Sequence, residues 1–157
     1  MASLDLELLP DTDAIDHRLT QLASEGPVAP AALQTPLLAN LSAQENLELV
    51  GAFHSQKGAS ALVARAAQTL ANLDMGPCAA RRPAELTDRE ALMIQLARAA
   101  MRPGALAVLV TPFTQAPELD SDAPIRQAIT ALGLNRLCIL DFPSNRHRYS
   151  AVSEVAP

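Results

Sequence analysis

The sequence is poor in aromatic residues, lysine and cysteine, and these shortages argue against several classes of protein. Aromatic residues make up 3% of the 157 positions, tryptophan is absent, and Lys57 is the only lysine. The two cysteines, Cys78 and Cys138, stand in apolar surroundings, which argues against a disulfide framework and fits a reducing compartment. No apolar run approaches the roughly 20 residues of a membrane-spanning helix. The start lacks the charged and apolar regions of a signal peptide, so we expect a soluble, cytoplasmic protein.

What the chain does contain is typical of one globular domain. Hydrophobic residues make up 49% and charged residues 18%, which is too apolar for a disordered chain. The formal net charge of -5 gives no general electrostatic basis for binding nucleic acid or an anionic membrane. We therefore expect a single folded domain over residues 1–157, with no nucleic-acid partner.

Hydrophobic periodicity predicts strands that alternate with helices. Leu4, Leu6 and Leu8 alternate with acidic residues, as in a half-buried strand. The apolar runs 105–110 and 136–141 have the length of strands buried on both faces of a parallel sheet. Apolar residues at helical spacing are Ile15, Leu19 and Leu22; Leu47, Val50 and Phe53; Leu62, Ala66, Leu70 and Leu73; and Ile125, Ile129 and Leu132. The alternation indicates an α/β layered domain.

Capping residues and prolines set the expected limits of several elements. Ser42 with Glu45, and Thr87 with Glu90, have the spacing of capping boxes, so a helix is predicted to begin at each. The stretch 25–36 holds three prolines and is predicted to be a loop.

The segment 85–101 reads Glu-Leu-Thr-Asp-Arg-Glu-Ala-Leu-Met-Ile-Gln-Leu-Ala-Arg-Ala-Ala-Met. It resembles the signature helix of the ATP-binding domains of ABC transporters, which opens Leu-Ser-Gly-Gly-Gln and continues to Ala-Arg-Ala-Leu. Leu86 and Thr87 match the first two positions, and Ala97-Arg98-Ala99 matches the later triplet in register.

Further segments match the same family in the same order. The strand 106–113 resembles the Walker B segment and keeps a proline and a phenylalanine at its end. Residues 36–47 are similar to the stretch after the Q-loop, whose glutamine would be Gln34. The strand 137–140 ends where the family places its switch histidine, and Phe142 stands at that position.

This resemblance covers roughly residues 30–145 and implies a fold. We expect an α/β domain with a shortened P-loop-type parallel sheet flanked by helices, and an ABC-like helical subdomain at about 42–101. The domain would be degenerate, because the residues that bind and hydrolyse ATP in this family have no counterpart.

The phosphate loop and the Walker B acids are replaced. Instead of a glycine-rich loop with a lysine, the turn after the first strand carries Asp11, Asp13 and Asp16, which would repel a triphosphate. The Walker B Asp and Glu correspond to Val110 and Thr111, so no carboxylate is expected to hold magnesium.

The signature and the adenine contact are replaced as well. The degenerate signature reads Thr87, Asp88, Arg89 and Glu90, with Asp88 and Arg89 in place of glycines. No aromatic residue precedes Phe53, so the ring that would stack on adenine is missing. We expect no bound cofactor and no catalytic residue.

Other constellations predict less. His17, His54 and His147 lie in separate elements without nearby Cys or His, and we predict no metal site. The basic pairs around Arg81 and Arg146 are interpreted as solvated surface, although the position of Arg81 in the family lies near the membrane subunit.

Three functions remain open from the sequence. The first is a non-catalytic subunit or regulator that docks on an ABC permease or on an active ATPase through Gln34, Leu37, Leu38, Arg81 and the helix 42–53. The second is a composite ATP-binding subunit that donates Thr87 and Arg89 to a complete partner. The third is an adaptor unrelated to transport. A second copy of the chain is a further expected partner, and any contact with a membrane would be indirect, through the complex.

Overall fold

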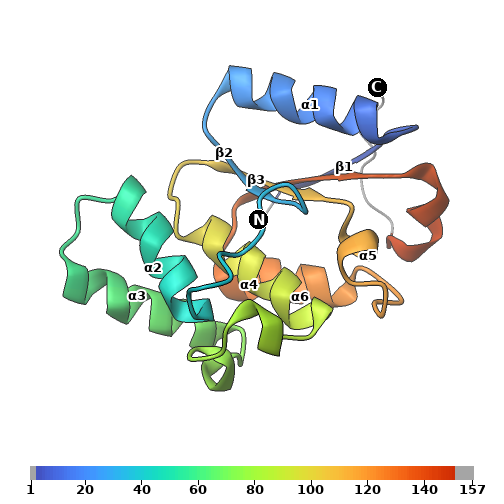
Figure 1. Ribbon diagram of the computed structural model, residues 1–157. Coiled ribbons are helices and arrows are strands. Elements are labelled where there is room, and N and C mark those ends of the chain that lie inside the picture. Colours follow the sequence, from blue (N-terminus) through green and yellow to red (C-terminus); the bar gives the residue numbers. More distant parts are fainter. Residues whose placement is uncertain (1–2, 151–157) are drawn as a thin grey trace.

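Four parallel strands form one sheet at the centre of the protein. The computed structural model describes residues 3–150 (Figure 1). The strands are β1 (Ser3–Leu8), β2 (Val28–Ala31), β3 (Leu106–Val110) and β4 (Arg136–Asp141), in the order β1-β4-β3-β2. The predicted strands at Leu4–Leu8 and in the two apolar runs are confirmed as β1, β3 and β4. Because all four strands are parallel, their carboxyl ends meet at one end of the sheet and their amino ends at the other.

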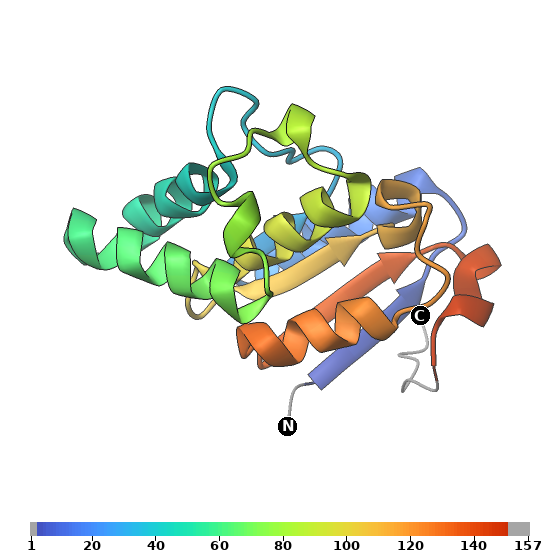
Figure 2. The ribbon, with the colours of Figure 1, turned by 90° about the horizontal axis from the view of Figure 1, so that it is seen from below.

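Helices cover the two faces of the sheet unequally, as Figures 1 and 2 show. One face carries α1 alone, whereas α4 and α6 cover the other face and α2 and α3 pack against α4. The helices are α1 (Thr12–Glu25), α2 (Ala43–His54), α3 (Ala59–Asn72), α4 (Asp88–Ala100), α5 (Pro112–Gln115) and α6 (Ala123–Leu132). Short 3-10 turns lie at Gly76–Cys78, Pro83–Glu85 and Pro143–Arg148.

The core consists of two apolar clusters separated by the sheet. Successive residues of β4 alternate between them: Leu137 and Ile139 face α4 and α6, while Cys138 and Leu140 face α1. This two-sided burial explains why the strand is a continuous apolar run. Burying one aliphatic side chain fully stabilises the folded state by about 1.5–3 kcal/mol. The buried residues of the sheet therefore supply much of the stability of the fold.

Both predicted capping boxes are present. The hydroxyl of Ser42 accepts a hydrogen bond from the backbone N–H of Glu45, and the Glu45 carboxylate accepts one from the N–H of Ser42. Thr87 and Glu90 make the same reciprocal pair. These caps begin α2 and α4, so the local sequence sets both helix starts.

Two details of the prediction are wrong. The stretch 25–36 is not all loop, because it contains β2, whose Pro30 is tolerated since this edge strand pairs only with β3. Phe53 does not point inward with Leu47 but is 78% exposed. Three residues on an α-helix fall about 60° short of a full turn. Phe53 comes two such steps after Leu47, so its side chain points well away from the buried face of the helix.

Candidate functional site

The carboxyl end of the sheet is the first place to look for a ligand. In open α/β sheets ligands bind outside the carboxyl ends of the strands, and helices that follow such strands direct their backbone N–H groups there. Here the turns after β1, β3 and β4 meet at this end, and each carries a residue predicted from the sequence.

The turn after β1 is closed by an acidic cap. The Asp11 carboxylate accepts a hydrogen bond of 2.8 Å from the N–H of Ala14 at the start of α1, and Asp13 lies in the first turn. Asp16 accepts a bond of 3.3 Å from Gln34, the candidate Q-loop glutamine. Side-chain carboxylates therefore occupy the end of α1 that would otherwise favour a phosphate.

The end of β3 offers no ligand for a metal. Val110 is 2% exposed, and Thr111 adopts a left-handed backbone conformation with φ 44°. The buried Gln115 amide donates to the carbonyl of Val110 at 2.6 Å and to that of Ala31 at 3.0 Å. An amide thus ties β3 to β2 at the position where a Walker B carboxylate would be needed.

The end of β4 holds a carboxylate that the sequence prediction missed. Asp141 is fully buried and accepts hydrogen bonds from the Tyr149 hydroxyl at 2.6 Å, the Asn145 amide at 3.0 Å and the Phe142 N–H at 2.8 Å. Burial and the adjacent Asp141 raise the pKa of Tyr149. Phe142, at the switch position, is half-buried. An acidic residue directly after a buried strand was the signal available in the sequence.

Tyr149 and Ser150, which follow β4, contact further residues at this end of the sheet. Asp122 is 2% exposed, pairs with Arg126 at 2.7 Å and accepts a hydrogen bond of 3.1 Å from the Ser150 hydroxyl. Tyr149 packs edge-on against Phe113, with ring centroids 5.2 Å apart. Both buried carboxylates of this end are therefore occupied by donors of the chain itself.

The residues of the predicted degenerate signature lie at the start of α4, and three of their backbone N–H groups are occupied by side chains. The Glu90 N–H donates to the Thr87 hydroxyl at 3.1 Å, and the Arg89 N–H donates to the Glu118 carboxylate at 2.7 Å. The hydrogen bond from the Thr87 N–H, more than the ion pair with Arg81, lowers the pKa of Glu90. Asp88 is exposed beside them. A carboxylate of the chain therefore stands where a signature N–H would meet a phosphate.

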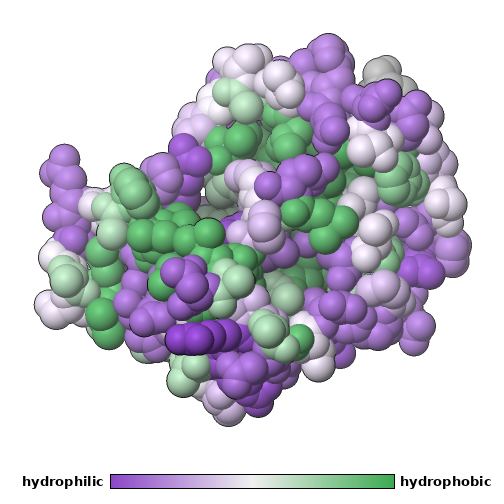
Figure 3. Space-filling model, in the orientation of Figure 1, coloured by the Kyte–Doolittle hydropathy of each residue, from purple (hydrophilic) through white to green (hydrophobic). Residues whose placement is uncertain are grey.

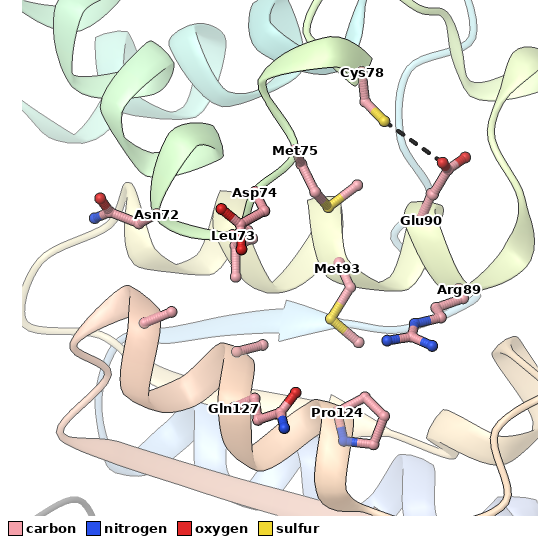
Figure 4. A pocket seen from close by; sticks show the side chains of 12 residues that line it. Asn72, Leu73, Asp74, Met75, Cys78, Arg89, Glu90, Met93, Pro124 and Gln127 are labelled. Carbon is pink, nitrogen blue, oxygen red and sulfur yellow. Dashed lines mark hydrogen bonds between the residues drawn. The ribbon is translucent and has the colours of Figure 1, made fainter.

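A pocket of about 290 Å³ opens beside this helix start (Figure 4). Met75 and Met93 point into it, and Cys78 points toward Glu90, with 3.6 Å between Sγ and Oε1. Burial raises the pKa of the Cys78 thiol, so the thiol is held in its neutral, unreactive form. Arg89 supplies the only cation in the lining of this pocket, against two acids, which does not favour an anionic ligand.

The predicted docking residues lie on or under the loop that joins β2 to α2. Gln34 and Leu38 are exposed, whereas Leu37 is 8% exposed and belongs to the core, so its side chain offers no docking surface. Arg81 directs its guanidinium to Glu90 at 3.5 Å rather than into this region.

A pocket of about 220 Å³ separates this loop from α2 and α4. Its lining includes Val50 and His54 of α2 and Thr35 and Pro36 of the loop. In Figure 3, apolar side chains gather over α2, next to a hollow in the surface. The exposed large apolar side chains of residues 3–150 are Leu33, Leu38, Leu49, Phe53 and Val63.

Two polar side chains hold the loop in place. The guanidinium of Arg98, from the matched Ala-Arg-Ala triplet, donates to the carbonyls of Thr35 and Pro36. The buried Asn46 amide accepts from the Leu38 N–H at 2.8 Å and donates to the Leu38 carbonyl at 3.2 Å. The loop with the predicted docking residues is therefore held in place by the fold.

The histidines stay apart in the structure. His17 bonds to Gln21 on α1, His54 lines the pocket beside α2, and His147 is exposed in the last 3-10 turn. Within residues 3–150, no group of three His, Cys, Asp or Glu side chains is arranged to hold a metal ion. No helix in that range has the length and apolarity needed to cross a bilayer.

Comparison with known proteins finds similarity in structure and none in sequence. No family model matches the chain, and no curated protein matches it in sequence. A bacterial ABC transporter cassette in a dimeric structure superposes with a TM-score of 0.68 at 13% identity, over 92% of this chain and 76% of the other.

Two further structures agree. An ABC transporter in an inward-facing conformation gives a TM-score of 0.62 at 19% identity, over 87% of this chain and 61% of that one. The ATP-binding subunit of an ABC transporter gives 0.64 at 12% identity, over 93% and 71%. The protein therefore has the α/β fold of ABC ATP-binding cassettes, and spans 61–76% of the length of these three chains.

Proposed function

We propose that this protein is a non-catalytic, ABC-ATPase-like subunit or regulator, formed by one domain over residues 1–157, which docks on an ABC permease or on an active ATPase partner. One observation carries the proposal: the cassette fold is present, but the chain's own side chains occupy the nucleotide end of its sheet. Asp11 caps α1, Gln115 joins β3 to β2, and donors of the chain surround Asp141.

The same geometry argues against a composite ATP site. In that alternative, Thr87 and Arg89 would contact a nucleotide bound to a partner. The Arg89 N–H already donates to Glu118, so a phosphate would have to displace a carboxylate, with Asp88 adding a second negative charge nearby. A degenerate pseudo-ATPase fits these contacts better than a half-site.

The surface around the loop after β2 supports docking. Leu33, Leu38, Leu49 and Phe53 expose 59%, 45%, 37% and 78% of their area, beside the pocket of about 220 Å³. Exposed apolar groups next to a pocket are typical of partner-binding surfaces. The partner best suited to this surface is an apolar helix or turn from a permease, which would place the protein peripherally at the inner face of a membrane.

A capture experiment tests the docking. The tagged chain should recover an ABC permease or a complete ATPase from detergent-solubilised membranes, and the variant L38D/F53D should lose that partner. Val63→Asp is the matched control, because Val63 is equally apolar and 45% exposed but lies on α3. Recovery of neither partner class, or equal loss in the control, would contradict the docking proposal.

A binding experiment tests the loss of catalysis separately. Titration of labelled ATP with magnesium should show no saturable binding to the isolated chain, because the start of α1 carries Asp11 and Asp13 in place of a lysine and glycines. Saturable binding that Asp11→Asn strengthens would show that the carboxyl end still admits a nucleotide.

A further inference from the structure

A third pocket, of about 440 Å³, lies at the opposite end of the sheet from the carboxyl ends of the strands. Its walls are the ends of α4 and α6 and the starts of β3 and β4, which lie on one side of the molecule in Figure 2. Gly104 and Gly133, with φ of 80° and 63°, form the two turns that lead from these helices into the strands. No Asp or Glu lines this pocket.

Three arginines from three different elements line it. Arg65 comes from α3, Arg102 follows α4, and Arg136 begins β4. The Arg65 guanidinium donates to the Ala100 carbonyl at 2.9 Å, and Arg102 donates to the Val28 carbonyl at 2.5 Å. Each bond uses one of the five donors of a guanidinium. Within residues 3–150, none of the three forms an ion pair, and Arg136 makes no hydrogen bond through its side chain.

The negative charge inside the pocket comes from the ends of two helices, and the nearby carboxylates lie outside its lining. Two helices end at the pocket, and each helix C-terminus contributes about half a negative charge. Asp5, Glu7 and Glu25 lie on the α1 side of Arg136, but Glu7 is already paired with Arg18 at 2.7 Å. The pocket itself therefore holds three arginines against about one negative charge from the helix ends, while the carboxylates of Asp5 and Glu25 lie outside its lining, in a chain whose net charge is -5.

We propose that this arginine pocket (Arg65, Arg102 and Arg136) binds a small, multiply charged phosphate anion. The planar guanidinium matches the oxygens of a phosphate with paired N–H donors, and three such groups around one hollow suit an anion with more than one negative charge. The site lies at the amino end of the strands, so it is separate from the end where a cassette would hold its nucleotide.

Calorimetric titration of the full chain with inorganic pyrophosphate tests the site. We expect saturable binding that weakens as ionic strength rises. Arg136→Gln should raise the Kd about tenfold, the change that follows from losing one charge-assisted contact. Arg82→Gln is the matched control, because Arg82 is an exposed arginine before α4, about 20 Å from the pocket along that 13-residue helix.

Arg65→Gln and Arg102→Gln remove donors that also hold the backbone, so their thermal unfolding is measured alongside. If either fails to fold, Arg136→Gln still decides the question, since its side chain makes no bond in residues 3–150. Absence of saturable binding, or equal weakening in Arg82→Gln, would overturn the proposal.

A second arm identifies the source of the phosphate. Flotation with vesicles that contain phosphatidic acid, compared with neutral vesicles, reports binding of a lipid headgroup. Pyrophosphate competing the chain off acidic vesicles would show that a headgroup enters the same pocket. Pyrophosphate binding without flotation would identify a free anion as the ligand. Flotation that Arg136→Gln leaves unchanged, without any pyrophosphate binding, would contradict the site.

Discussion

The charged side chains that surround the candidate sites differ between the two ends of the sheet. At the carboxyl end, Asp11, Asp141 and Glu118 accept hydrogen bonds from the chain's own N–H and O–H groups. At the amino end, Arg65 and Arg102 donate to backbone carbonyls and stand with Arg136 around an open pocket that no acid lines. A phosphate-binding cassette needs a phosphate site at the carboxyl end, where this chain has placed carboxylates.

The difference shows how the sequence sets the charge at each end of a given fold. Helix starts favour anions and helix ends favour cations, and this holds for any sequence with this topology. The chain supplies its own anions at one end and its own cations at the other. In the arginine pocket the three positive charges exceed what the two helix ends offer, and that excess makes the pocket the better candidate for an external anion.

The largest expected effect is at the carboxyl end. Asp141→Ala leaves the donors of Tyr149, Asn145 and Phe142 buried without their acceptor, and should lower the free energy of unfolding by about 3–5 kcal/mol. Urea unfolding measures it. Tyr149→Phe, which removes one donor and leaves the carboxylate, should cost about 1–2 kcal/mol. A loss below about 1 kcal/mol for Asp141→Ala would mean that this cluster does not close the carboxyl end.

A smaller effect is expected from the left-handed glycine at the amino end. Gly133 ends α6 with φ 63°, and a Cβ there would meet no atom within 4 Å. Gly133→Ala should therefore cost about 1–2 kcal/mol through backbone conformation alone. Gly26→Ala is the control, because Gly26 has extended φ and equally open surroundings. Equal costs at both positions would show that φ is not the cause.

The smallest effect, and the only gain, is expected at the left-handed residue of the carboxyl end. Thr111 holds φ 44° with a β-branched side chain, which costs about 1–3 kcal/mol in backbone strain. Thr111→Gly relieves that strain but makes the unfolded chain more flexible, so a net gain of about 0.5–1 kcal/mol in the free energy of unfolding is expected. A thermal melt is sufficient to detect it, and a loss would show that the Thr111 side chain contributes more by packing than its backbone costs.

The helices and strands that were predicted correctly are determined by short segments of sequence. Two capping boxes began α2 and α4, and two continuous apolar runs became β3 and β4. The errors have non-local causes. Strand β2 contains Pro30 and pairs with β3, and Leu37 belongs to the core cluster that also holds side chains of α2 and α4.

The features of the candidate site also fall into those with local causes and those with non-local causes. The predicted replacement of a phosphate loop and of Walker B acids rests on residues 11–16 and 110–111, because composition at a turn is local information. The partners that take the place of a ligand could not be predicted in this way. Asp141 meets Tyr149 eight residues later, and Arg89 meets Glu118 across 29 residues.

The sequence by itself determined the alternation of strands and helices, because hydrophobic period and helix caps are properties of short segments. The proposed absence of ATP chemistry rests on the same kind of local information, namely the side-chain types that are missing at single turns. Only the tertiary structure decided which end of the sheet is closed and which is open to an anion. Arg65, Arg102 and Arg136 are spread over 71 residues. They line one pocket because α3 packs against α4, and because the parallel sheet brings the end of α4 and the start of β4 to the same end of the molecule.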